Sequence, residues 1–187
     1  MIRRSLPVIG LLVASSCAAP SRKLPPEHGI PHFHEVTSGV YRGGQPTTEG
    51  WAYLKSKDVK TVVKLDLESE GSDEEAVKLG MTVVDASGPP SDLSNVFGAP
   101  KPGRIRLAVA TLQDERLRPV YVHCLHGQDR TGLIVGLFRV LHDGYTKKAA
   151  YAEMRRHGFH PALRGLHEVW EHFDAKTLPG AQPDRPE

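Results

Sequence analysis

The sequence predicts a single α/β domain with a largely parallel central sheet that is flanked by helices. Short β-branched segments alternate with amphipathic segments, as expected for strands that are joined by helices in a parallel sheet. The chain has 187 residues, of which 39% are hydrophobic, enough for one domain with a sizeable core. A β-rich segment also runs into an apolar helical segment across residues 118–144. These three observations exclude an all-helical or all-β fold.

The first half of the domain is expected to begin with short strands around Val36 and Val40 that end at the turn Gly43-Gly44. A helix follows over residues 47–57, capped by Thr47 or Thr48. The β-branched segment at 60–67 reads as a buried strand.

The next helix is predicted at residues 72–80, where Ser72 and Glu75 form a capping box and Gly80 ends the helix. A strand at 81–86 and a long proline-rich loop follow. The second half is predicted to contain a helix at 104–115, a strand at 118–123, and helices at 131–144, 146–158 and 161–176. The three last helices should pack on one face.

The N-terminus differs from the rest of the chain. A basic start, the apolar run SLPVIGLLVA and the small residues SSCAAP predict a signal peptide over residues 1–17. The segment VASSC resembles a bacterial lipobox, which would lipidate Cys17, although ordinary cleavage near Ala18-Ala19 is the alternative. We expect an exported, periplasmic or membrane-anchored protein with a tether at 18–35, a folded domain at 36–175 and a disordered tail at 176–187.

The charge of the chain is nearly balanced, with 24 basic and 22 acidic residues. Removal of the leader would take away Arg3 and Arg4 and make the two counts equal. There is no block of like charge, so we expect no nucleic-acid partner. The chain is expected to be a monomer without a cofactor.

Cysteine is scarce, because Cys17 and Cys124 are the two in the chain. If Cys17 is lipidated or removed, Cys124 has no disulfide partner and is either inert or chemically useful. It lies in VHCLHGQDRTG, between a predicted strand and an apolar helix, an arrangement that aims backbone N–H groups at an anion. Gly127 permits a tight turn, and the Arg130 guanidinium can grip two phosphate oxygens. The substrate-binding residues are therefore predicted to be Leu125, His126, Gly127, Gln128, Asp129 and Arg130.

The same setting favours chemistry at Cys124. A helix N-terminus and adjacent positive charge stabilise a thiolate, which would face the bound phosphorus and attack it to form a phosphocysteine. Thr131 can donate its hydroxyl to the sulfur and stabilise it as a leaving group in the second step.

The segment VHCLHGQDRTG resembles the signature loop of the protein tyrosine phosphatase superfamily, in which His-Cys is followed by five residues, Arg and then Ser or Thr. The upstream segment GVYRGGQPTTEGWAYLKSKDVKTVVKLDLESE is similar to the start of compact bacterial members related to dual-specificity phosphatases. The resemblance covers about residues 36–175. It implies that His123 stabilises the loop and tunes the cysteine.

The resemblance also implies an aspartic general acid on a separate loop. Asp92 lies 32 residues before Cys124, in the proline-rich loop, and is the favoured candidate. Asp129 is the rival, because an Asp directly before the loop arginine resembles myotubularin-type lipid phosphatases. Its alternative role is to anchor the loop by accepting backbone hydrogen bonds.

Histidine is abundant, with 10 residues, but the spacing of His123, Cys124 and His126 does not match a structural zinc site. No metal site is expected.

The substrate is predicted to be a phosphorylated small molecule or a phosphoprotein. Aromatic residues make up only 6% of the chain, and the loop resembles cysteine-dependent phytases as much as phosphoprotein phosphatases. We expect inositol polyphosphates as substrates. The alternative is that the protein is a phosphotyrosine-protein phosphatase without activity on inositol phosphates. A non-catalytic phosphate-binding module and a rhodanese-type sulfur transferase fit the motif less well. The candidate cations for peripheral phosphates are Arg42, Lys64, Lys101, Arg104, Arg155, Arg156 and Arg164.

Overall fold

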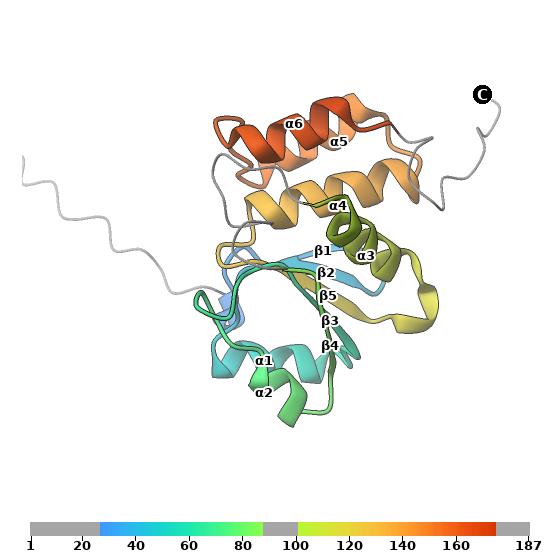
Figure 1. Ribbon diagram of the computed structural model, residues 1–187. Helices are drawn as coiled ribbons and strands as arrows, with labels where there is room; N and C mark the ends of the chain where they lie inside the picture. Colours follow the sequence, from blue (N-terminus) through green and yellow to red (C-terminus); the bar gives the residue numbers. More distant parts are fainter. Residues whose placement is uncertain (1–26, 88–100, 175–187) are drawn as a thin grey trace, which may run out of the picture.

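The computed structural model describes residues 27–87 and 101–174. Its centre is a five-stranded sheet with the order β1-β2-β5-β3-β4 (Figure 1). The strands are β1 (His34–Thr37), β2 (Val40–Gly43), β3 (Thr61–Lys64), β4 (Thr82–Asp85) and β5 (Val120–His123). The β1 strand is antiparallel to β2, and the other pairs are parallel. The predicted α/β fold with a largely parallel sheet is confirmed.

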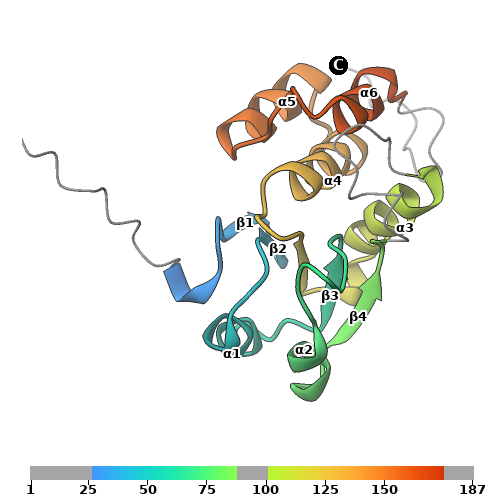
Figure 2. The ribbon, with the colours of Figure 1, turned by 60° about the vertical axis from the view of Figure 1, so that its left-hand side comes forward.

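Helices cover both faces of the sheet, as Figures 1 and 2 show. They are α1 (Thr48–Ser56), α2 (Glu74–Lys78), α3 (Pro102–Gln113), α4 (Asp129–Leu141), α5 (Lys147–Arg156) and α6 (Arg164–His172). The α1 and α2 helices lie on one face, and α3 and α4 lie on the other. The three C-terminal helices pack together as predicted, but α5 and α6 lie on the outer side of α4 (Figure 1).

Each face of the sheet has its own hydrophobic core. The larger core joins β2, β3 and β5 to α3 and α4 and extends to Met154 of α5 and Trp170 of α6. The smaller core joins the sheet to α1 through Trp51 and Leu54. The β5 strand is central in the sheet and buried along its whole length. The residues that follow it are therefore held by the packing on both faces of the sheet.

The register of the parallel strands sets the position of the site. Gly43 of β2 and Lys64 of β3 both pair with His123 of β5. The three strands therefore end level with one another, and their carboxyl ends form a common edge, where ligands bind in open α/β sheets.

Helix capping follows the sequence in part. The Thr47 side chain accepts a hydrogen bond from the Gly50 N–H and caps α1, as predicted. Gly80 follows α2 with a φ of 82°, which confirms it as the residue that ends the helix. The predicted capping box at Ser72 is wrong, because the N-cap residue is Asp73 and its side chain makes no capping hydrogen bond. Its carboxylate binds other side chains instead, as the site shows.

The predicted tether requires a correction for residues 27–35. Ile30 is buried, the Gly29 carbonyl accepts a hydrogen bond from the Thr47 N–H, and β1 already begins at His34. Hydrophobic burial thus attaches this segment to the domain. The predicted signal peptide, the remainder of the tether, most of the proline-rich loop and the tail lie outside the described residues.

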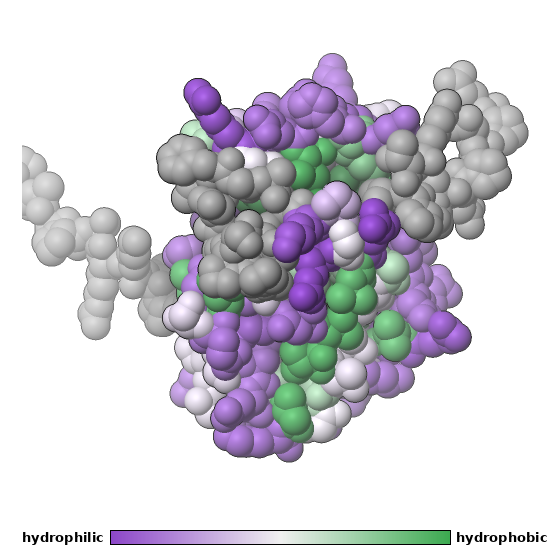
Figure 3. Space-filling model, viewed as in Figure 1, coloured by the Kyte–Doolittle hydropathy of each residue, from purple (hydrophilic) through white to green (hydrophobic). Residues whose placement is uncertain are grey.

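The β4 strand is the outermost strand on one side of the sheet, and its residues Val83 and Val84 are half-buried. Figure 3 shows apolar side chains below α3, on the side where β4 and α2 lie, while most of the visible surface is hydrophilic. Across residues 27–87 and 101–174, no helix combines the length and apolar character that a bilayer span needs.

Candidate active site

The predicted strand–loop–helix arrangement surrounds Cys124. The β5 strand ends at His123, the helix α4 begins at Asp129, and residues 124–128 form the connection, here called the signature loop. Cys124 is a free thiol and is 2% exposed. The α4 helix begins two residues earlier than predicted, so that Asp129 and Arg130 belong to its first turn. The positive end of the helix therefore lies directly beside the loop.

The signature loop is fixed by the backbone of the β2–α1 connection. Gly127 has a φ of 74°, and a Cβ at this position would overlap the backbone of Gly43 and Gly44. The Gln45 N–H donates to the Leu125 carbonyl at 3.0 Å. Gly127 is therefore required both for its backbone conformation and for the close approach of two chain segments, as its place in the motif predicts.

Arg130 is held by a bidentate ion pair with Glu70, which lies on the segment after β3. Its Nη1 and Nη2 atoms are 2.7 and 2.8 Å from the two carboxylate oxygens of Glu70. The hydrogen bond from Arg130 lowers the pKa of Glu70. Burial opposes the charge of Arg130, but the pairing with Glu70 outweighs burial and raises the pKa of Arg130. A guanidinium has five N–H donors, so this pair leaves donors for a phosphate.

The His123 side chain lies in a buried cluster of ionisable groups. Its Nε2 atom is 3.0 Å from Asp73 Oδ2, and its Nδ1 atom is 3.5 Å from Asp66 Oδ1. Burial raises the pKa of Asp66 despite the neighbouring His123 and Lys64. At Asp73 burial also acts against the charge, but the His123 hydrogen bond and Lys64 prevail and lower the pKa. The Asp73 carboxylate therefore fixes the imidazole ring, whereas Asp66 lies beside Nδ1 without a hydrogen bond to it. The contact with Asp73 supports the predicted stabilising role of His123.

Two of the cations expected at the mouth of the site are buried inside the domain. Lys64 is 4% exposed, and its Nζ atom is bound by Glu68, Asp73 and the Gly71 carbonyl. Arg42 is fully buried, and its Nη2 atom donates to the Gly127 carbonyl at 2.9 Å. Both side chains point into the fold from inner strands, so neither is placed to hold a peripheral phosphate.

Asp129 connects the start of α4 to the segment between α5 and α6. Its Oδ1 atom accepts a hydrogen bond from the His160 N–H at 2.7 Å and lies 3.1 Å from His160 Nδ1. This contact is the anchoring role that we considered as the alternative for Asp129. The favoured acid, Asp92, lies outside the described residues, so the assignment of the general acid stays a prediction.

The remaining residues of the motif differ in accessibility. His126 is exposed, Leu125 and Gln128 are partly exposed, and Thr131 is fully buried. The Thr131 hydroxyl forms no hydrogen bond with any described residue, Cys124 included. The hydrogen bond predicted from the Thr131 hydroxyl to the Cys124 sulfur is therefore not formed in the described part of the chain.

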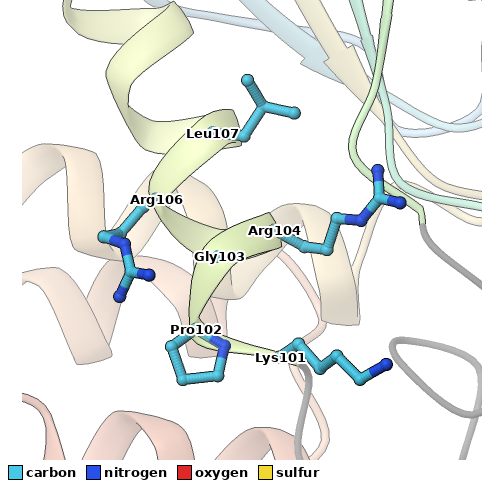
Figure 4. Close-up of a pocket in the computed structure, with 6 residues that line it drawn as sticks. All are labelled: Lys101, Pro102, Gly103, Arg104, Arg106 and Leu107. Atoms are coloured by element: carbon cyan, nitrogen blue, oxygen red, sulfur yellow. The ribbon is translucent and has the colours of Figure 1, made fainter.

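Basic residues also lie at the start of α3 and around the α5–α6 segment. Figure 4 shows an open pocket where Lys101, Arg104 and Arg106 point in different directions. Arg104 Nη1 donates to the Asp85 carbonyl, which places this cation at the carboxyl end of β4, on the edge of the sheet that carries the signature loop. Arg155, Arg156 and Arg164 are exposed near the segment that binds Asp129.

No group of His, Cys, Asp and Glu in the described ranges could hold a metal ion.

The family described as "PTP-NADK: DSP-PTPase phosphatase fused to NAD+ Kinase" matches residues 26–164. The chain belongs to this family of DSP-PTPase phosphatases. The match spans the whole signature loop and both strands that flank β5.

Similar curated proteins include phosphatases with different named substrates. "Dual specificity protein phosphatase TpbA" from Pseudomonas aeruginosa (strain UCBPP-PA14) is 32% identical over 128 residues, which are 68% of this chain and 55% of that protein. "Inositol diphosphatase DSP2" from Oryza sativa subsp. japonica is 32% identical over 116 residues, 59% of this chain and 54% of that protein. The chain thus matches about half the length of each of these relatives.

The fold of this DSP-PTPase family member is similar to solved structures. The core catalytic domain of PP-IP phosphatase SIW14 from S. cerevisiae superposes with a TM-score of 0.65 and 22% identity, covering 82% of this chain and 90% of that chain. P. aeruginosa TpbA in complex with pTyr superposes with a TM-score of 0.63 and 23% identity, covering 84% of this chain and 93% of that chain.

Several residues of the site in this DSP-PTPase chain were missed by sequence reasoning. Asp66, Glu70 and Asp73 all follow a buried strand, which is the position where α/β folds carry ligand-binding side chains. That signal was available, but Asp66 was assigned to the strand at 60–67 and Asp73 to the helix at 72–80, and Glu70 between them was given no role. His160 gave no signal, because its contact with Asp129 joins residues 31 apart in the chain.

Proposed function

We propose that the chain is a cysteine-dependent phosphatase that hydrolyses phosphate monoesters through a phosphocysteine. One observation carries the proposal: a nearly buried free thiol begins a loop that ends at the N-terminus of α4, beside an arginine fixed by Glu70. Backbone N–H groups, a helix N-terminus and a guanidinium together suit one tetrahedral oxyanion.

In the first step, the Cys124 thiolate attacks phosphorus, a sulfur–phosphorus bond forms, and the bond to the leaving oxygen breaks. The leaving oxygen takes a proton from a carboxylic acid, for which Asp92 remains our candidate. In the second step, water attacks phosphorus and gives one proton to the carboxylate left by the first step, the sulfur–phosphorus bond breaks, and phosphate leaves with the thiolate restored.

We further propose inositol polyphosphates as substrates. The support is that Arg104 is fixed at the edge that carries the signature loop and that Arg155, Arg156 and Arg164 are exposed near its Asp129 contact. Relatives named inositol diphosphatases agree with this substrate class, whereas TpbA, crystallised with pTyr, favours phosphotyrosine as the alternative.

The test compares inositol hexakisphosphate with p-nitrophenyl phosphate at increasing ionic strength. Salt screens charges that are exposed, so the KM for the inositol substrate should rise clearly, while that for the aryl phosphate should change little. Arg104→Ala and Arg164→Ala should each raise the inositol KM. Lys60→Ala is the matched control, because Lys60 is an exposed cation directly before β3, at the opposite edge of the sheet.

Efficient cleavage of phosphotyrosine peptides, with no activity on any inositol phosphate, would contradict the inositol proposal. The phosphatase proposal would survive that result, since both substrate classes use the same loop.

We also propose export with a lipid on Cys17, supported by the lipobox-like segment. Cell fractionation should recover the protein with membranes, and Cys17→Ser should move it to the soluble periplasmic fraction. An uncleaved protein in the cytoplasmic fraction would contradict this proposal.

A further inference from the structure

Arg42 is the largest fully buried side chain in the described part of the chain, and it lies against the signature loop. It belongs to β2 and pairs in register with Val122, two residues before Cys124. Its Nη2 atom donates to the Gly127 carbonyl at 2.9 Å, and it also lies within 3.8 Å of the Cβ that Gly132 would carry. Arg42 therefore reaches both the loop and the first turn of α4.

The orientation of the Gly127 carbonyl determines the direction in which the Gln128 N–H points. In a trans peptide, the carbonyl of one residue and the N–H of the next point in opposite directions. Because Arg42 holds the Gly127 carbonyl toward the interior, the Gln128 N–H points away from the interior, toward the open side of the loop. A peptide free to turn over would present a carbonyl to the phosphate instead.

The charge of Arg42 has no carboxylate of its own. Its Nε and Nη1 atoms are buried and meet no acceptor among the described residues. The ionisable groups around it are Cys124, Glu153, Tyr121, Arg139 and His157. The Glu153 carboxylate is bound to Arg139 Nε at 3.1 Å. Burial is the main reason that the pKa of Arg42 is lowered to about 10, and Cys124 and Glu153 act against this effect.

A buried guanidinium with a single hydrogen bond is costly unless another charge compensates it. Among the groups around Arg42, Cys124 is the one that lies in the loop, and it acts against the effect of burial. Its thiolate and the phosphate that it attacks would supply the compensating negative charge. The charge of Arg42 is thus placed below the site of reaction, on the side opposite to the solvent.

We propose that Arg42 is a positioning residue of the phosphate site: it orients the Gly127–Gln128 peptide and supplies buried positive charge beneath Cys124. The proposal rests on the phosphocysteine chemistry proposed above, and it is independent of which phosphate ester is the substrate. The two arginines then have separate tasks, since Arg130 binds the phosphate directly and Arg42 shapes the loop from below.

The test uses Arg42→Met, Arg42→Gln and Arg42→Lys in a Cys17→Ser background, so that Cys124 is the single thiol. Two properties are measured without turnover: orthovanadate affinity, and the rate of Cys124 alkylation by iodoacetamide at fixed, near-neutral pH. Arg42→Met should weaken orthovanadate binding and slow alkylation by at least about tenfold, less than the roughly 10²–10³ typical for loss of a direct oxyanion donor. Arg42→Lys should recover part of both properties.

Arg118→Met is the matched control. Arg118 is a mostly buried arginine that donates to the Leu112 carbonyl, but it lies before β5, at the edge of the sheet opposite to the loop. The Arg118→Met variant should have a smaller free energy of unfolding than the wild type, with no change in orthovanadate affinity or in the rate of Cys124 alkylation.

A folded Arg42→Met protein with wild-type orthovanadate affinity and alkylation rate would overturn the proposal. If Arg42→Met does not fold, the same two measurements on Arg42→Gln and Arg42→Lys decide in the same way. Failure of all three variants to fold would assign Arg42 to the fold alone and also overturn it. If the wild type hydrolyses no phosphate ester, the phosphatase proposal fails, yet both measurements still report on Arg42.

Discussion

Arg130 and Glu70 form a bidentate ion pair across 60 residues of sequence, with N–O distances of 2.7 and 2.8 Å. Glu70 lies on the segment after β3, and Arg130 lies in the first turn of α4. The pair fixes the arginine before a substrate arrives, which reduces the conformational entropy lost on binding.

We therefore expect Glu70→Gln to lower kcat/KM for an aryl phosphate by about tenfold, because a hydrogen bond between charged groups contributes roughly 1.5 kcal/mol. Steady-state kinetics measure the change. Glu74→Gln serves as the control, because the Glu74 side chain is 80% exposed and contacts only Lys78 among charged groups of the described chain. Equal effects of the two variants would argue against a role for Glu70 in the site.

Gly127→Ala should abolish activity and destabilise the domain. The residue has a φ of 74°, and its added Cβ would overlap Gly43 and Gly44. Gly144→Ala is the matched control, because Gly144 has a φ of 73° but has no atom within 4 Å of the added Cβ. Urea unfolding should show a loss of about 1–2 kcal/mol for Gly144→Ala from backbone conformation alone. Its activity should remain, and a larger activity loss at Gly144 than at Gly127 would refute the packing argument.

Asp73→Asn should remove stability that depends on pH. The pKa of Asp73 is lowered below its ordinary value of 3.8, so its stabilisation is complete above that value and is lost as pH falls through the lower folded-state pKa. Urea unfolding near neutral pH should show a loss of about 1–3 kcal/mol in the variant. The difference between wild type and variant should shrink in acid, and a constant difference would contradict the assignment.

The general acid is tested by two variants and two leaving groups. Asp92→Asn should lower turnover of an alkyl phosphate by roughly 10²–10⁴, because its leaving oxygen needs a proton. Turnover of an aryl phosphate with a good leaving group should barely change. Asp129→Asn should affect both substrates alike, since Asp129 accepts the His160 N–H. Selectivity in Asp129→Asn instead would place the acid in the signature loop.

The sequence predicted the parts of the site that are close together in the chain. The strand, the loop around Cys124 and the following helix depend on local pattern, and Gly127 has the positive φ that the motif implied. The partners from other strands were not predictable in this way. Burial of Arg42 and Lys64 depends on which strands lie beside β5, so exposed and buried cations look alike in a sequence.

The central claim is that Cys124 carries the phosphoryl group, and trapping that intermediate tests it most directly. The purified protein is mixed with an aryl phosphate, quenched in acid during turnover and digested for mass spectrometry. We predict one phosphoryl group on the peptide that contains Cys124. Cys124→Ser should lose both this adduct and turnover while it still binds orthovanadate. Phosphate release at the wild-type rate by Cys124→Ser, or a phosphoryl group on another residue, would contradict the account.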